Sequence, residues 1–405
     1  MGPSSNGKWQ IRFGQIFRHQ LDDLENRHPN CYVNRLQDCF FFHSKQEEIF
    51  KAESPPKDPY KDLNLSQNLS TYRKYFTTGR AEEPDSLNAS LSERMDTTFI
   101  LVPGFGHQLI KPSNGMSDDC EYLRSQGFDI RYAPFSDSLS SSKNCSKKLM
   151  EIILEWQDLK KNIAFIGYSF GMLVVLELLQ EKAFKGLREK VRSVVSLGGA
   201  LKGAVFTENL GIQVAKQTLQ IFQKVHEKKN QVLEAKLVKS LRDSLDLQIP
   251  WSSGVRQVMD RLETFSKDLS DLPEGLESLG KANSKWGVPE QFPDDLDLFS
   301  ISAVCPRTFL KGEHILPDNP DDLFLFLTSK DLYKNHGPYN DAQLLISETL
   351  FPDQLKKPAI HLGTVCADHW GLAYPKVLSN TYEDRFPRPA LMEAIVLTLS
   401  EFYPS

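Results

Sequence analysis

The chain has 405 residues, of which 40% are hydrophobic and 25% are charged, and its formal net charge is −5. This composition is ordinary for a globular protein, and the small negative charge argues against the basic surface of a nucleic-acid-binding protein. No apolar run reaches the roughly 18 residues that a membrane-spanning helix needs.

The first residues and the cysteines bear on the compartment. Residues 1–6 lack the apolar segment of a secretory signal, which predicts a cytoplasmic protein, or an exported one if these residues replace a removed signal. The cysteines show none of the spacings typical of a metal site, and we expect free thiols. In an exported protein a Cys31–Cys39 or a Cys120–Cys145 disulfide is the alternative. The six are Cys31, Cys39, Cys120, Cys145, Cys305 and Cys366.

Residues 1–95 have the least regular pattern. A strand-like or buried apolar patch at 31–42 is followed by a Pro-rich, charged break at 53–59 and then by a Ser/Asn-rich stretch. We expect an N-terminal extension that packs on the main domain, and no chemistry is assigned to it.

From residue 97 onward, apolar runs alternate with amphipathic segments. The expected strands are 97–102, 128–132, 162–166, 191–197, 300–304 and 360–365. The expected helices are 147–156, 172–179, a segment from 320 to about 336, and 389–402. This alternation predicts an α/β fold with a mainly parallel central sheet flanked by helices, in which ligands bind at the carboxyl ends of the strands.

The alternation stops after the strand at 191–197. Three apolar stripes at helical spacing follow, which predicts a helical insertion at 204–295. We expect this cap to lie over the active site and to contact substrate; the alternative is that the stripes only pack against the core. The predicted division is 1–95 as an extension, 96–203 and 296–405 as the two parts of the core, and 204–295 as the cap.

The motif G-x-S-x-G stands at residues 167–171, between an expected strand and an expected helix. This context is typical of a nucleophile elbow, a sharp turn that lifts the serine hydroxyl out of the sheet. Glycines at 167 and 171 are expected because side chains there would collide with the neighbouring strand and helix. The pattern predicts Ser169 as the nucleophile.

A serine nucleophile needs a base, and in this order of motifs the base comes last. His369 is the only histidine that follows the last expected strand, so it is the predicted base. His361 lies at the start of that strand and is read as structural, and His314 and His336 as solvated. His107 adjoins the turn after the first core strand and stays open as a substrate contact.

The acid that orients the base has two serious candidates, Asp341 and Asp331. Asp341 follows the expected helix in a loop and is the predicted acid. Asp331 would take its place if 323–327 were a strand, but the spacing of the apolar residues there favours a helix. Asp368 adjoins His369 and is expected to point away from it in an extended backbone.

An acyl-transfer site also needs donors for the oxyanion of the tetrahedral intermediate. The residue after the nucleophile supplies one backbone N–H, here Phe170. The second is expected from the turn that follows the first core strand, from Phe105 or, as the alternative, from Gly106.

These motifs resemble those of the α/β-hydrolase superfamily, and among its members the bacterial lipases and esterases with an Asn-Asp-Gly acid loop and an Asp-His-Trp base segment. The resemblance covers residues 97–402 apart from the insertion, through 102–106, 167–171, 340–341 and 368–370. It implies a triad of Ser169, Asp341 and His369. Ala342 stands where the family pattern has glycine. Gly371 replaces the aspartate of calcium-binding relatives, so no calcium site is expected.

The resulting expectation is a serine hydrolase that cleaves carboxylic esters, most of all lipid or other acyl esters, without cofactor or metal. A thioesterase or amidase with the same triad is one alternative, and a non-catalytic binding protein on the same scaffold is another. The expected partner is a small acyl ester or lipid, and neither nucleic acid nor a transmembrane segment is expected. Peripheral membrane contact and the oligomeric state stay open.

Overall fold

The computed structural model describes the core of the chain and one N-terminal helix. The described residues are 5–27, 40–41, 96–107, 116–208, 274, 276–280, 292, 294–304, 325, 328–329, 332, 335–336, 339–352, 354–374 and 386–403. Most of the predicted cap, including residues 209–273, lies outside them, as do Cys31, Cys39, Cys305 and Asp331.

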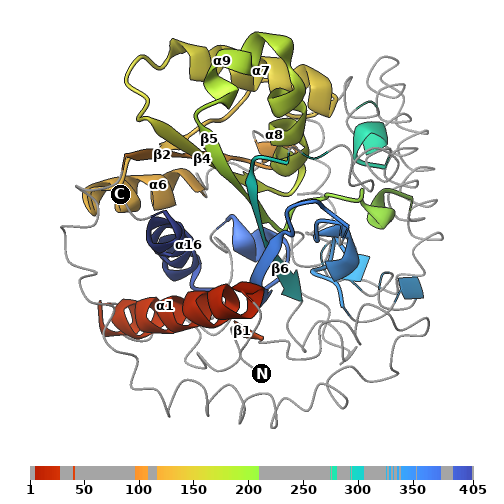
Figure 1. The fold of residues 1–405 in the computed structure, drawn as a ribbon. Coiled ribbons are helices and arrows are strands. Elements are labelled where there is room, and N and C mark those ends of the chain that lie inside the picture. The colour runs from red at the N-terminus through yellow and green to blue at the C-terminus, as the bar shows by residue number, and fades with distance from the viewer. Residues whose placement is uncertain are drawn as a thin grey trace, which may run out of the picture.

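A twisted sheet of seven strands, in the order β1-β7-β6-β5-β4-β2-β3, forms the centre of the molecule (Figure 1). Six of the strands are parallel, and only the short β1 pairs antiparallel, with β7. The expected mainly parallel sheet is therefore confirmed. The strands are β1 (Phe40–Phe41), β2 (Thr97–Val102), β3 (Ile130–Tyr132), β4 (Asn162–Tyr168), β5 (Val191–Leu197), β6 (Asp297–Val304) and β7 (Ile360–Cys366).

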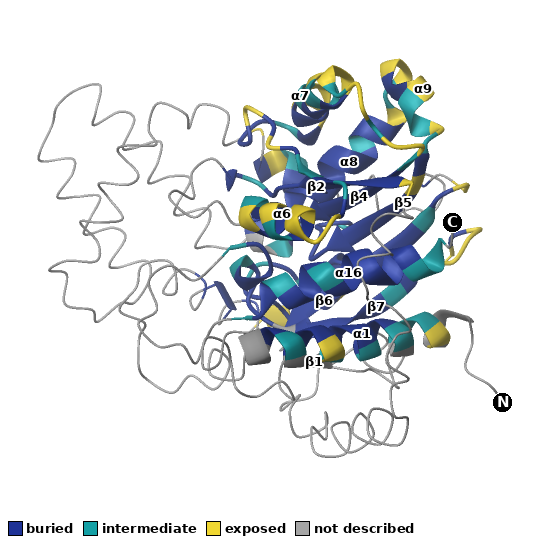
Figure 2. Ribbon diagram, turned by 90° about the vertical axis from the view of Figure 1, so that its left-hand side faces the viewer, coloured by how far each residue is buried: buried dark blue, intermediate teal, exposed yellow. Residues whose placement is uncertain are grey.

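Helices cover both faces of the sheet (Figures 1 and 2). One face carries α7 (Ser142–Glu155), α8 (Phe170–Gln180) and the short α9 (Lys185–Arg188). The other carries α1 (Ser5–Arg27), α6 (Met116–Ser125) and α16 (Arg388–Phe402). Single 3₁₀ turns occur at Lys182–Phe184, Val205–Glu208, Ile346–Glu348 and Trp370–Leu372. None of the helices in the described part of the chain is both long and apolar enough to span a membrane.

Side chains that alternate along each strand build two separate apolar cores. On β2, Phe99 and Leu101 face α1 and α16, whereas Ile100 and Val102 face α7 and α8. Both faces are buried, which is why these strands read as continuous apolar runs in the sequence. Helix α8 is buried on nearly every side, and this places the residue that precedes it, Ser169, on a rigid support.

The N-terminal helix α1 was not expected from the sequence. Its apolar side chains recur every three or four positions and are almost fully buried against α16 and β7: Phe13, Ile16, Phe17, Leu21 and Leu24. That spacing was the signal in the sequence. The residues therefore contribute to the main core, and deleting them would expose the apolar face of α16.

Polar and aromatic contacts fasten α1 to α16 at its outer end. Arg12 donates two hydrogen bonds to the Glu401 carboxylate, from Nε at 2.6 Å and from Nη2 at 2.5 Å. The Trp9 and Phe402 rings lie 4.8 Å apart between their centroids. A bidentate arginine–carboxylate pair fixes orientation as well as distance, so it adds a directional contact to the apolar packing of α1 on α16.

The sequence predicted the bounds of most elements closely. Strand 191–197 has its predicted bounds, and the strand before the elbow extends two residues further than predicted, to Tyr168. Helix α7 begins earlier than expected, at Ser142, and β3 is shorter, beginning at Ile130. The described residues within 320–336 are helical, as expected.

The suggested Cys120–Cys145 disulfide is wrong. Both side chains are free thiols, and they lie in different cores, on opposite faces of the sheet. Burial raises the pKa of each thiol to about 12, so neither is a thiolate near neutral pH, and no reactive cysteine is expected at these positions.

Replacing Arg388 with methionine should destabilise the protein strongly, by about 3–5 kcal/mol in the free energy of unfolding. Arg388 Nε donates to Asp119, and both side chains are buried. Burial already raises the Asp119 pKa, and Arg388 opposes that rise. Without the cation the folded-state pKa rises further, so folding favours the protonated acid and stability falls as pH rises.

Denaturant titrations at pH 5 and pH 8 check this. The loss should be larger at pH 8, and an Asp119→Leu/Arg388→Met double variant should recover most of it because no unpaired charge remains. A similar loss at both pH values, unchanged in the double variant, would contradict a charge-based cause.

Candidate active site

Ser169 occupies a sharp turn between the end of β4 and the start of α8. Its backbone has φ 53° and ψ −124°, a conformation that a residue with a side chain rarely adopts. The Ser169 N–H donates to Leu197 O at 3.1 Å and the Ser169 carbonyl accepts from Met172 N at 3.1 Å. These bonds hold the strained turn, and they place the serine side chain at the carboxyl edge of the sheet, where it is half-buried.

The two glycines of the motif are required by close approach of the backbone. A Cβ at Gly167 would lie 2.7 Å from Met172 Cα in α8. A Cβ at Gly171 would lie 2.5 Å from the Val102 carbonyl oxygen and closer still to that of Pro103, at the end of β2. The collisions expected from the sequence are therefore present, and they involve backbone atoms that cannot rotate away.

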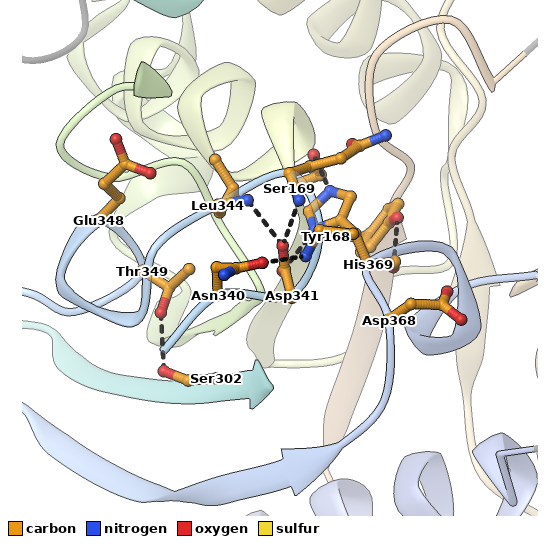
Figure 3. Close-up of polar contacts among 12 residues, drawn as sticks. Tyr168, Ser169, Ser302, Asn340, Asp341, Leu344, Glu348, Thr349, Asp368 and His369 are labelled. Atoms are coloured by element: carbon orange, nitrogen blue, oxygen red, sulfur yellow. Dashed lines mark hydrogen bonds and ion pairs between the residues drawn. The ribbon is translucent and has the colours of Figure 1, made fainter. Parts of the chain in front are cut away.

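The structure brings together the three side chains that the sequence predicted for the triad (Figure 3). His369 Nε2 lies 2.7 Å from Ser169 Oγ, and His369 Nδ1 lies 2.6 Å from Asp341 Oδ2. Asp341 and His369 are 0% and 2% exposed. They arrive from separate loops, Asp341 between β6 and β7 and His369 directly after β7, and the His369 N–H donates to the Asp341 carbonyl at 2.6 Å.

The hydrogen bonds around Asp341 assign the proton on His369. Asp341 Oδ1 accepts from the N–H groups of Gln343 and Leu344, at 3.0 and 2.7 Å, and Oδ2 faces His369 Nδ1. A carboxylate offers only acceptors, so Nδ1 carries the proton and donates. In the neutral imidazole Nε2 is then an acceptor aimed at the Ser169 hydroxyl, which is the arrangement that a general base needs.

The acid loop tolerates alanine where the family pattern has glycine. Ala342 has φ 80°, the left-handed region, which costs a non-glycine residue about 1–2 kcal/mol. Its N–H donates to the Asn340 side chain at 3.0 Å, and its own side chain is fully buried. Asp341 still reaches His369, so this departure leaves the contact intact.

Asp368, the other described carboxylate near His369, serves the backbone instead. Its Oδ1 accepts from the Gly371 N–H at 2.8 Å, in the turn that follows His369. In Figure 3 its side chain lies on the far side of His369 from Ser169, in agreement with the expectation that it points elsewhere.

The turn after β2 touches the elbow directly. A Cβ at Gly104 would lie 3.1 Å from Ser169 Cβ, and the rings of Phe105 and Phe170 are in edge-to-face contact at 5.4 Å between centroids. The Gly106 N–H donates to Ser138 O at 3.1 Å, which makes Gly106 unavailable as an oxyanion donor. The Phe105 N–H has no acceptor among the described residues. The Phe170 N–H lies in the first turn of α8, where amides lack helical acceptors.

The other histidines in the described ranges take no part in this chain of hydrogen bonds. His107 is buried, its Nδ1 lies 3.1 Å from Gly104 O, and its ring contacts Phe135 edge-to-face. Burial lowers the His107 pKa to about 4, so the ring is neutral near pH 7. His361 Nδ1 contacts Ser300 Oγ at 3.0 Å, on the sheet, and His336 is exposed. His314 lies outside the described residues.

Two contributors to the site were missed in the sequence. Glu348 is buried, and its carboxylate accepts from Val205 N at 2.7 Å and from Leu345 N at 2.8 Å. It thereby ties the start of the insertion to the acid loop. Tyr168 donates from its hydroxyl to the His369 carbonyl at 2.8 Å. No sequence signal pointed to either, because both contacts join segments far apart in the chain.

The described residues of the site form no metal-binding cluster. Across the described ranges, no group of three or more histidine, cysteine, aspartate or glutamate side chains is arranged to hold a metal ion. The polar groups of Ser169, His369 and Asp341 are satisfied by one another and by backbone amides.

Comparisons with known proteins show what this architecture resembles. No protein-family model matches the sequence, and no curated protein matches it significantly. Among solved structures, the metagenomic carboxyl esterase MGS0156 is similar over 99% of this chain and 97% of its own, with a TM-score of 0.59 and 18% identity.

Two further solved structures overlap less well. Lipase 1 from Pelosinus fermentans is 11% identical over 76% of this chain and 99% of its own, with a TM-score of 0.46. EstA from Clostridium botulinum is 14% identical over 92% and 98%, with a TM-score of 0.41. The parallel sheet, the strained serine turn between β4 and α8, and the likeness to the carboxyl esterase together show that this chain has the α/β-hydrolase fold.

Proposed function

We propose that the protein is a serine hydrolase that cleaves carboxylic esters through an acyl-enzyme. The observation that carries this proposal is the unbroken chain of hydrogen bonds from Ser169 Oγ through His369 to Asp341, at 2.7 and 2.6 Å, on a strained elbow. A serine hydroxyl with a purely structural role needs only one hydrogen-bond partner. A nucleophilic serine needs a base held in place by a carboxylate, as Ser169 has here.

In the proposed reaction Ser169 Oγ attacks the ester carbonyl carbon while His369 Nε2 takes the hydroxyl proton. The carbonyl oxygen becomes an oxyanion, which the backbone N–H groups of Phe105 and Phe170 stabilise. Collapse of this intermediate breaks the bond to the alcohol, which leaves with the proton from His369. Water, deprotonated by His369, then attacks the carbonyl carbon of the acyl-enzyme. The bond to Ser169 Oγ breaks, Ser169 takes the proton back from His369, and the acid is released. Asp341 holds the imidazole and stabilises its protonated form.

Acyl or lipid esters are the proposed substrate class. The apolar stripes of 204–295 would supply surface for an acyl chain, and the Phe105–Phe170 pair places aromatic surface beside the nucleophile. The name of the similar metagenomic carboxyl esterase supports ester cleavage as the reaction. Thioesters and amides react through the same groups, so substrate assays must separate these three classes.

Labelling with a fluorophosphonate probe tests this function. The wild-type protein should become covalently labelled, with the adduct on the peptide that contains Ser169, and Ser169→Ala should not label. Hydrolysis of p-nitrophenyl esters from acetyl to palmitoyl should then show a preferred chain length, which measures the acyl pocket. A folded wild-type protein that neither labels nor hydrolyses any ester, thioester or amide would overturn the proposal in favour of a binding role.

A further inference from the structure

Tyr168, the residue before the proposed nucleophile, packs against the proposed base. Its side chain is 2% exposed, and its ring centroid lies 5.1 Å from that of the His369 imidazole. The Tyr168 hydroxyl donates to the backbone carbonyl of His369 at 2.8 Å (Figure 3). Tyr168 thus contacts the ring and the backbone of His369, whereas Ser169 Oγ meets only the Nε2 atom of the same residue.

The same ring supports the proposed oxyanion turn. A Cβ placed on Gly104 would lie 2.9 Å from two ring carbons of Tyr168, so the Gly104 backbone rests directly on the aromatic ring. Gly104 precedes Phe105, the proposed oxyanion donor. One side chain thus touches both the loop that follows β2 and the loop that follows β7, and it is itself anchored in β4.

A buried phenol usually finds a hydrogen-bond partner, so a hydrogen bond alone assigns no role. The acceptor suggests a role other than packing, because it is the backbone carbonyl of His369, the residue whose ring must reach Ser169. Burial raises the Tyr168 pKa well above its ordinary value, so the hydroxyl stays protonated and remains a donor at any working pH.

We propose that Tyr168 is a positioning residue, whose hydroxyl fixes the backbone of His369 so that the imidazole meets Ser169 Oγ and Asp341 together. This inference rests on the proposed function. The loop that carries His369 has its own helical turn at Trp370–Leu372, and the Tyr168 bond ties that turn to the strand that carries the nucleophile. Without the bond, His369 is still tied to Asp341, but among the described residues no other hydrogen bond links its backbone to the strand that carries the nucleophile, and acyl transfer is steeply sensitive to displacements of the base.

The chain supplies a matched control at Tyr374. Its hydroxyl is buried and has no hydrogen-bond partner among the described residues, and its ring lies 6.0 Å from that of Tyr168, edge-to-face. Tyr168→Phe and Tyr374→Phe therefore each remove one buried hydroxyl from the same aromatic cluster. Only the first removes a bond to His369.

The two variants should be compared with wild type for kcat and KM on a p-nitrophenyl ester and for the rate of fluorophosphonate labelling, well below their melting temperatures. Tyr168→Phe should lower kcat and the labelling rate about tenfold, as loss of one hydrogen bond that acts on the reacting geometry would do. KM should change little, and Tyr374→Phe should match wild type. Equal labelling rates and kcat in Tyr168→Phe and wild type would overturn the inference, as would an equal loss in both variants.

A readout that needs no turnover separates this inference from the proposed function. The His369 Nδ1–H proton, hydrogen-bonded to Asp341, should give a far-downfield proton NMR signal that disappears in Asp341→Ala. In Tyr168→Phe this signal should shift or broaden, and in Tyr374→Phe it should not. If the wild-type protein shows the signal but neither labels nor hydrolyses esters, the proposed function fails. The role of Tyr168 in holding His369 is then still tested by comparing the signal between Tyr168→Phe and wild type.

Discussion

Asp341→Asn should lower kcat for ester hydrolysis by about 10⁴-fold while leaving the fold intact. The reason lies in the two backbone N–H groups, of Gln343 and Leu344, that already donate to one carboxylate oxygen. An asparagine must turn its only oxygen toward these two donors. Its NH₂ group then faces His369 Nδ1, at the position where the carboxylate oxygen Oδ2 lies now.

That orientation forces the wrong tautomer on the base. An amide N–H donor opposite Nδ1 requires Nδ1 to be the acceptor, so the ring proton moves to Nε2. Nε2 can then no longer accept the Ser169 proton, although the side chains keep their places. Steady-state kinetics, together with a melting curve to show that the fold is retained, measure this effect.

Asp368→Asn is the matched control for this change. Asp368 adjoins His369, but its Oδ1 accepts the backbone N–H of Gly371 at 2.8 Å, and an asparagine oxygen can accept the same bond. We expect its kcat to stay within about threefold of wild type, since the acceptor is preserved. A large loss in Asp368→Asn with none in Asp341→Asn would mean that the wrong carboxylate has been assigned.

Gly171→Ala should lower the free energy of unfolding by about 3 kcal/mol or more and should abolish fluorophosphonate labelling. A Cβ there meets the carbonyl oxygens of Val102 and Pro103, and neither can move without shifting β2 or the turn that carries Phe105. The first turn of α8 would have to retreat instead, which moves Ser169 and the Phe170 N–H away from the site. Thermal melts and labelling gels measure the two effects.

Gly186→Ala provides the control for alanine in place of glycine. Gly186 is exposed in α9, and a Cβ there meets no heavy atom within 4 Å. Because alanine favours a helix over glycine by up to about 1 kcal/mol, this variant should be as stable as wild type or slightly more so, with unchanged labelling. A Gly171→Ala protein that melts and labels like Gly186→Ala would contradict the steric account of the elbow.

Local patterns in the sequence were enough for the strands and for Ser169. The strands of this sheet are buried on both faces, so each is a short apolar run that can be recognised without its neighbours. The elbow is likewise local, since a strand, two glycines around a serine, and a helix occupy one continuous stretch. His369 and Asp341 could be predicted from chain order, but the hydrogen bonds from Ser169 to His369 and from His369 to Asp341 could not be demonstrated from it.

Helix α1 shows where local reasoning fails. Its apolar face, with Phe13 and Phe17 fully buried, has helical spacing, but the polar residues between them obscure the pattern. This apolar face packs against α16, which lies at the other end of the chain. A sequence shows that a segment could bury an apolar stripe, but not what is available to cover it.

Within the site, the sequence by itself determined the residue types and their order: a serine between glycines, then an aspartate in a loop, then a histidine after the last strand. Only the tertiary structure decided which backbone N–H groups remain available, because the Gly106 amide is taken by Ser138. The tertiary structure alone also brought the Tyr168 hydroxyl to the His369 carbonyl and the Glu348 carboxylate to the Val205 N–H. These contacts join residues far apart in the chain. Their distances are set by packing of the whole sheet, and no local sequence pattern contains that information.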